Sequence, residues 1–128
     1  MAVSMRRDVA TGVVIATCSG TLGVDDAKAG AGAVWNDPEW SGKPIVWDLR
    51  LAHLDVGAED VREVARFVLE RQPSTPPPKV GFVTARDVDF GLARMFEVFR
   101  QSPSTEVRIF RDFDEAMSWA GTVESKSG

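Results

Sequence analysis

The sequence predicts an α/β domain with a mixed, mostly parallel five-stranded sheet and four helices. After residue 20, short apolar runs alternate with segments of helical periodicity, a pattern typical of parallel sheets. Two strand-like segments precede the first helix, so one strand must be antiparallel. The 128 residues, 44% of them hydrophobic, suffice for one core. We therefore expect the order β-β-α-β-α-β-α-β-α within a single domain over residues 1–120, followed by a flexible tail at residues 121–128.

The first half of the chain contains a hairpin, two helices and a central strand. Residues 5–19 alternate weakly around turn residues 10–12 and predict a hairpin, in which residues 13–18 form the better strand. A helix follows, with acidic residues in its first turn and an apolar face formed by Val24, Ala27, Ala31, Val34 and Trp35. Residues 45–47 predict a short buried strand. Residues 58–72 predict a second helix, whose apolar face comprises Val61, Val64, Ala65, Val68 and Leu69.

The second half repeats the alternation after a proline-rich connector at residues 74–78. Residues 79–84 predict a buried strand. Asp87 or Asp89 can cap the next helix, whose apolar stripe is Val88, Leu92, Met95, Phe96 and Phe99. Residues 106–110 predict a strand near an edge, and residues 112–120 a final helix. The predicted sheet core is Val14, Ile45, Trp47, Val80, Phe82 and Ile109.

Composition narrows the possible functions. The net charge is −4 and the basic residues are spread along the chain, so we expect no nucleic-acid partner. The single cysteine, Cys18, fits a reducing cytoplasm, and no apolar run is long enough to span a membrane. One histidine and one cysteine cannot supply a catalytic triad or a typical metal-ligand set. We expect a cytoplasmic protein with no catalytic residues, metal or cofactor.

Four segments, in this order and spacing, resemble a known family: SGTLGVDDAK, IVWDLRLAHLDVGAEDV, FGLARMFEVF and EVRIFRDFDEAMSW. They are similar to the STAS domains of anti-anti-sigma factors, and most of all to the SpoIIAA-like branch that is related to Sec14-type lipid-binding domains. The similarity extends from about residue 9 to residue 119. It implies the STAS fold and a non-enzymatic regulatory role through protein association. The Sec14 relationship implies an alternative, a peripheral binder of a lipid or another amphipathic molecule.

The turn Asp55-Val56-Gly57-Ala58 departs from the pattern of this family. Regulatory members carry an Asp-Ser-Ser-Gly-like turn here, and a kinase modifies a serine at the start of the next helix. Only the aspartate is present in this chain, so the resemblance does not carry over the phosphorylation switch. Asp55 either positions the loop for a partner or accepts hydrogen bonds from its own turn.

Surplus aromatic residues form the second candidate site. Phe90 lies about 160° around its helix from the stripe that contains Leu92 and Phe96. Trp40 lies in a polar loop, and Arg86 and Arg94 flank Phe90. Phe90 is either a hydrophobic staple at the helix start or a contact residue.

These residues suggest contact with a protein, a second subunit in a homodimer, or a lipid at a membrane surface. An enzyme of unknown chemistry remains a remote alternative.

Overall fold

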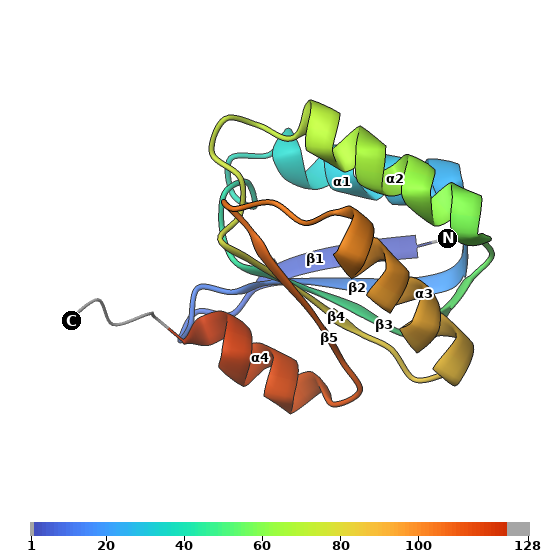
Figure 1. The fold of residues 1–128 in the computed structure, drawn as a ribbon. Helices are drawn as coiled ribbons and strands as arrows, with labels where there is room; N and C mark the ends of the chain where they lie inside the picture. The colour runs from blue at the N-terminus through green and yellow to red at the C-terminus, as the bar shows by residue number, and fades with distance from the viewer. Residues whose placement is uncertain (1, 123–128) are drawn as a thin grey trace.

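The computed structural model describes residues 2–122 and has the predicted element order (Figure 1). Its elements are β1 (Ala2–Arg7), β2 (Val14–Leu22), α1 (Val24–Trp35), β3 (Ile45–Leu54), α2 (Ala58–Arg71), β4 (Lys79–Val83), α3 (Asp87–Phe99), β5 (Glu106–Phe110) and α4 (Phe113–Gly121). The strand order is β1-β2-β3-β4-β5, with β1 antiparallel to β2 and the other neighbours parallel. The predicted fold class is therefore confirmed. Residues 123–128 of the predicted tail lie outside the described residues.

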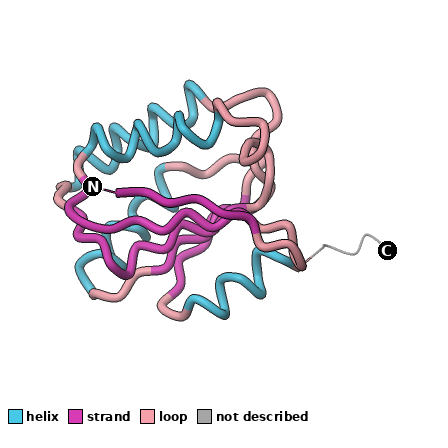
Figure 2. Tube along the Cα trace, turned by 180° about the vertical axis from the view of Figure 1, so that it is seen from behind, coloured by secondary structure: helices cyan, strands magenta, loops and turns pink. Residues whose placement is uncertain are grey.

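The sheet is covered on both faces, by α1, α2 and α3 on one side and by α4 on the other (Figures 1 and 2). Side chains alternate between the two faces along each strand. Ile45 and Val80 pack in the cluster on the α1 side, whereas Val46 and Val83 pack with Ala116 of α4. The strands are consequently apolar on both faces, as expected for parallel strands.

The predicted sheet core is largely confirmed. Val14, Ile45 and Val80 are buried, and the half-buried rings of Trp47 and Phe82 pack against them. Ile109 is only half-buried because β5 is an edge strand.

Strand β3 is longer than the predicted residues 45–47. It pairs with β4 only as far as Asp48, but with β2 as far as Leu54, so the two strands project beyond β4. The polar residues that end the apolar run in the sequence are paired inside the strand. Arg50 Nε and Nη2 each donate to the Asp48 carboxylate over 2.8 Å.

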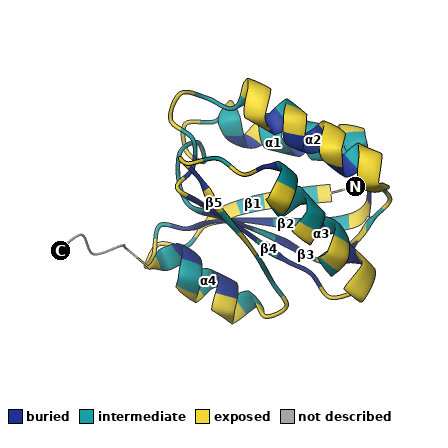
Figure 3. Ribbon diagram, viewed as in Figure 1, coloured by how far each residue is buried: buried dark blue, intermediate teal, exposed yellow. Residues whose placement is uncertain are grey.

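Helix α3 is rotated relative to the prediction by roughly a quarter turn. Its most buried side chains are Asp89 and Ala93, together with Arg100 at the C-cap. Val88, predicted on the buried stripe, is 57% exposed, and Figure 3 shows exposed positions along the outer side of α3. The predicted stripe is therefore wrong in its orientation, although Phe96 does contact the sheet residue Phe82, edge to face.

The start of α3 explains this orientation. The N-cap is Arg86, which makes no side-chain cap, so the predicted capping by Asp87 or Asp89 is wrong. Asp89 instead turns inward, where its carboxylate accepts hydrogen bonds from Arg86 and from the backbone N–H of Leu54 in β3. This buried carboxylate fixes α3 to the end of β3.

Candidate functional site

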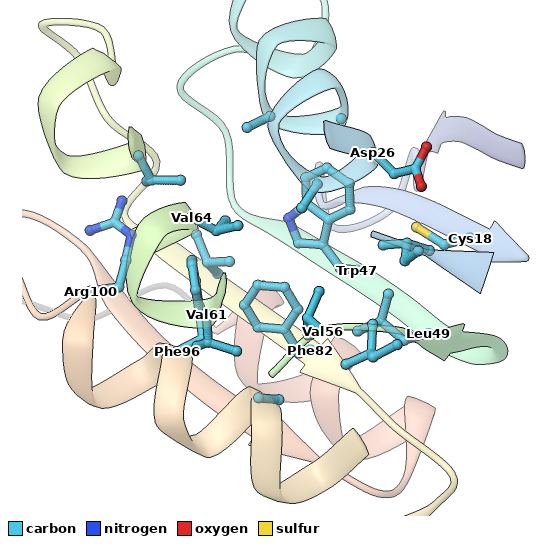
Figure 4. A pocket seen from close by; sticks show the side chains of 18 of the residues that line it. Cys18, Asp26, Trp47, Leu49, Val56, Val61, Val64, Phe82, Phe96 and Arg100 are labelled. Atoms are coloured by element: carbon cyan, nitrogen blue, oxygen red, sulfur yellow. The ribbon is translucent and has the colours of Figure 1, made fainter. Parts of the chain in front are cut away.

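An apolar pocket of about 170 Å³ lies between the sheet and helices α1, α2 and α3 (Figure 4). It exists because α2 makes its main contacts with α1 and α3 rather than with the sheet beneath it. Gly30 of α1 faces Trp47 of β3, and a Cβ atom at this position would make ordinary van der Waals contact with the ring at 3.5 Å. The side chains around the pocket are mostly aliphatic and aromatic, among them Leu49, Trp47, Val56, Val61, Val64, Val68, Phe82 and Phe96.

Two charged side chains, Arg100 and Asp26, contribute to the lining, on opposite sides of the pocket in Figure 4. The Asp26 carboxylate accepts the backbone N–H of Gly23 over 2.9 Å and so completes the start of α1. Arg100 is only 3% exposed, and its Nη2 donates to Gln72 Oε1 over 2.9 Å. Its Nη1 is buried without a hydrogen-bond partner among residues 2–122.

Burial changes the acid–base properties of two lining residues. It lowers the pKa of the Arg100 guanidinium, which nevertheless remains protonated at neutral pH. It also raises the pKa of the Cys18 thiol to about 11, with a smaller contribution from the negative charge of Asp48. Cys18 is therefore a neutral thiol at neutral pH, and thiolate chemistry is suppressed.

The structure brings the predicted turn 55–57 next to the start of α3, through the hydrogen bond of 3.4 Å from Leu54 N–H to Asp89 Oδ1. Asp55 is exposed, and its backbone N–H donates to the Leu22 carbonyl over 2.8 Å. Gly57 is the N-cap of α2. Val56 lines the apolar pocket, so this turn links the surface to the interior.

The three predicted residues in and before α3 have intramolecular partners. Arg86 pairs with Asp89 over 2.9 Å, and Arg94 pairs with Glu97 over 3.2 Å. Phe90 is half-buried, with the guanidinium carbon of Arg111 4.4 Å from its ring centroid.

Trp40 lies apart from the other predicted residues. It belongs to the connection between α1 and β3, at the opposite end of the parallel strands from the turn 55–57 (Figure 1). Its half-buried ring packs against the core cluster that contains Val14 and Val34. The predicted contact residues therefore do not form one continuous site.

Neither the pocket nor the place of Arg100 in it was predicted from the sequence. One signal was available, because Arg100 follows Ala93 and Phe96 at helical spacing and thus continues a face that contacts the sheet. Within the described residues, no group of three or more His, Cys, Asp or Glu side chains is placed to hold a metal. No helix in the same part of the chain is both long and apolar enough to cross a membrane.

Comparison with solved structures shows which known fold the chain has. No protein-family model and no curated protein matches the sequence. Several solved structures are similar, and two of them match over nearly their whole lengths, each at 14% identity. An uncharacterised Shewanella loihica protein of the DUF3478 family, described as having a SpoIIAA-like fold, superposes with a TM-score of 0.58 over 93% of this chain and 92% of its own. An anti-sigma factor antagonist from Mycobacterium paratuberculosis superposes with a TM-score of 0.59 over 94% and 96%.

The chain thus has a SpoIIAA-like fold, as the resemblance of its sequence predicted. At this sequence identity the similarity establishes the fold, whereas function must be argued from the sites of this chain.

Proposed function

We propose that this protein is a non-enzymatic regulatory domain of the STAS type that acts by associating with a protein partner. The observation that carries the proposal is the apolar outer face of α3. Val88 and Val98 are 57% and 60% exposed, and the half-buried Met95 lies between them on the same face. Contiguous exposed apolar side chains commonly mark interaction surfaces.

The location of this face supports the same proposal. Its N-terminal end adjoins the turn of Asp55, Val56 and Gly57, and Phe90 and Arg94 lie beside it on α3. The similar Mycobacterium protein is described as an anti-sigma factor antagonist, which by that name acts on a protein. We infer that the partner is a protein of the anti-sigma factor kind, with a second copy of this chain as the alternative.

We further propose that association is independent of phosphorylation in the turn 55–58. This stretch contains no serine, threonine or tyrosine. Ser41 lies in the connection between α1 and β3, at the other end of the parallel strands. A phosphate mapped to Ser41 by mass spectrometry that controls association would therefore show that a phosphorylation switch operates outside this turn and would contradict a phosphorylation-independent mode of association.

The association proposal is tested by placing acidic groups on the outer face of α3. The double variant Val88→Asp/Val98→Glu should lose binding to the anti-sigma factors of the source organism, measured by calorimetry, or lose self-association, measured by sedimentation. The matched control is Val9→Asp, since Val9 is 96% exposed in the β1–β2 turn, away from α3. Unchanged association of the double variant, or equal loss in the control, would refute the assignment.

The apolar pocket favours a second candidate function, binding of a small amphipathic molecule. Apolar cavities of about 150 Å³ stay dry and take up small hydrocarbons such as benzene, and this pocket of about 170 Å³ is comparable.

Ala31→Leu should fill the pocket and abolish binding of 1-octanol, because Ala31 lines it. Ala33→Leu on the exposed side of the same helix is the matched control. Binding of 1-octanol that survives in Ala31→Leu would place the ligand elsewhere.

A further inference from the structure

We propose that the pocket binds an amphiphile with a short apolar body and a carboxylate head, and that Arg100 binds the head. This inference rests on the second candidate function, since it requires that the pocket holds a ligand. It assigns the ligand class and names the residue that selects it.

The first argument is the uncompensated charge of Arg100. The residue is 3% exposed, and the identified side-chain partner of its guanidinium is the neutral amide of Gln72. No carboxylate among residues 2–122 forms an ion pair with it. A buried charge without a counter-ion is costly, and such groups concentrate at functional sites. An anionic ligand would supply the missing counter-ion.

The second argument concerns how this charge is tolerated without a ligand. Arg100 and Gln72 are the C-cap residues of α3 and α2, so two helix C-termini meet here. Their partial negative charges stabilise a nearby cation. These partial charges provide no hydrogen bond to Nη1 of Arg100, which is buried and has no hydrogen-bond partner among residues 2–122. Arg100 lines the pocket, so a small shift of its side chain would let this nitrogen donate to a carboxylate oxygen of a ligand held there.

The remaining lining residues narrow the chemistry of the head group. A phosphate monoester would bring up to two negative charges to a single arginine, one of whose nitrogens is already engaged by Gln72. A cationic head would be repelled by Arg100. The other charged lining residue, Asp26, lies across the pocket, and its carboxylate already accepts the backbone N–H of Gly23 at the N-terminus of α1. A single carboxylate therefore matches the charge and the free donor.

The test compares ligands that share one apolar chain. Octanoate, 1-octanol, octylammonium and octyl phosphate are titrated into the wild-type protein near neutral pH by calorimetry, with NMR to locate the site. We expect octanoate to bind at least about tenfold more tightly than 1-octanol, a preference of about 1.4 kcal/mol. We expect octylammonium to bind more weakly than either.

The variant Arg100→Gln distinguishes the contribution of the carboxylate head to binding from that of the apolar chain. It should reduce octanoate affinity to that of 1-octanol and leave 1-octanol binding unchanged. Arg94→Gln is the control, because Arg94 is exposed on the same helix and should not alter either ligand. If Arg100→Gln does not fold, the wild-type comparison decides, supported by the NMR shift of the Arg100 side-chain N–H groups on addition of octanoate.

The outcomes distinguish this inference from the proposal on which it rests. If neither octanoate nor 1-octanol binds, the pocket is not a ligand site and both fail. If 1-octanol or octylammonium binds as tightly as octanoate, the pocket stands and the role of Arg100 is refuted. Tighter binding of octyl phosphate would refute the carboxylate assignment.

Discussion

Replacing Arg100 by methionine should stabilise the ligand-free protein. Arg100 is 3% exposed and has no counter-ion among the described residues. Methionine retains a long flexible chain that can occupy the same apolar space, but it carries no charge. The substitution therefore removes the cost of burying the guanidinium while largely preserving the packing of its stem.

The expected gain in the free energy of unfolding is the penalty for burying the charge less two contributions that offset it. The effective penalty for burying an ion is several kcal/mol. Against it, the charged hydrogen bond to Gln72 contributes about 1.5–3 kcal/mol, and each helix C-terminus about 0.3–1 kcal/mol. We expect a net gain of about 1–3 kcal/mol for Arg100→Met. For a domain of this length, the melting temperature should rise by roughly 3–10 °C.

Urea denaturation and calorimetry measure this gain, and an unchanged m-value would confirm that the unfolding transition is comparable. Arg94→Met is the control on the exposed side of α3 and should shift stability by less than about 0.5 kcal/mol. Octanoate should raise the melting temperature of the wild type more than that of Arg100→Met, in which only the apolar chain contributes to binding. A loss of more than about 1 kcal/mol in Arg100→Met would show that the guanidinium is a structural link, and the reasoning would be refuted.

Three further predictions concern other parts of the fold. Gly57→Ser should raise stability by a few tenths of a kcal/mol in urea melts, because serine is a better N-cap of α2 than glycine. Gly23→Ser at the start of α1 should give a gain of the same size, and a loss of stability in both variants would contradict this account. The hydrogen bonds from Arg50 hold the pKa of Asp48 below its usual range. The pair therefore stabilises the fold above the unfolded-state pKa of about 4, and this stabilisation is lost as the pH falls through the folded-state pKa. Asp48→Asn should lower stability at neutral pH and weaken the fall of the melting temperature at acid pH, whereas an unchanged fall at acid pH would count against the pair. The native Cys18 thiol, whose pKa is about 11, should resist Ellman's reagent at about pH 8 until the protein is unfolded, and rapid native labelling would show that its burial is incomplete.

The sequence predicted the elements and sheet pattern well because these depend on local periodicity. Parallel strands buried on both faces give short apolar runs, and residues 45–47 and 79–84 show them clearly. The extension of β3 to Leu54 was not predicted, because Asp48 and Arg50 interrupt the apolar run. Their mutual ion pair, which keeps both in the strand, becomes visible only in three dimensions.

The candidate site was predicted less well for a physical reason. Periodicity shows which side chains share a helix face, but not the distance between a helix and its sheet. The pocket depends on that distance, since α2 packs on α1 and α3 above the sheet. Phe90 was correctly predicted to lie outside the core clusters, but its cover, Arg111, comes from the connection between β5 and α4.

Helix α3 departs furthest from the sequence rules, and its departures coincide with both proposed sites. Local rules place apolar residues inside and charges outside, yet this helix exposes Val88 and Val98 while Asp89 and the C-cap Arg100 are buried. Asp89 has a structural explanation, because it fixes the helix to β3 through Leu54. Arg100 has only the neutral Gln72 as a side-chain partner and no counter-ion among the described residues, and the exposed valines have no cover in the monomer. Proteins usually violate such rules where function requires it. One orientation of α3 therefore accounts for both an outward surface suited to a protein partner and an inward charge suited to an anionic ligand.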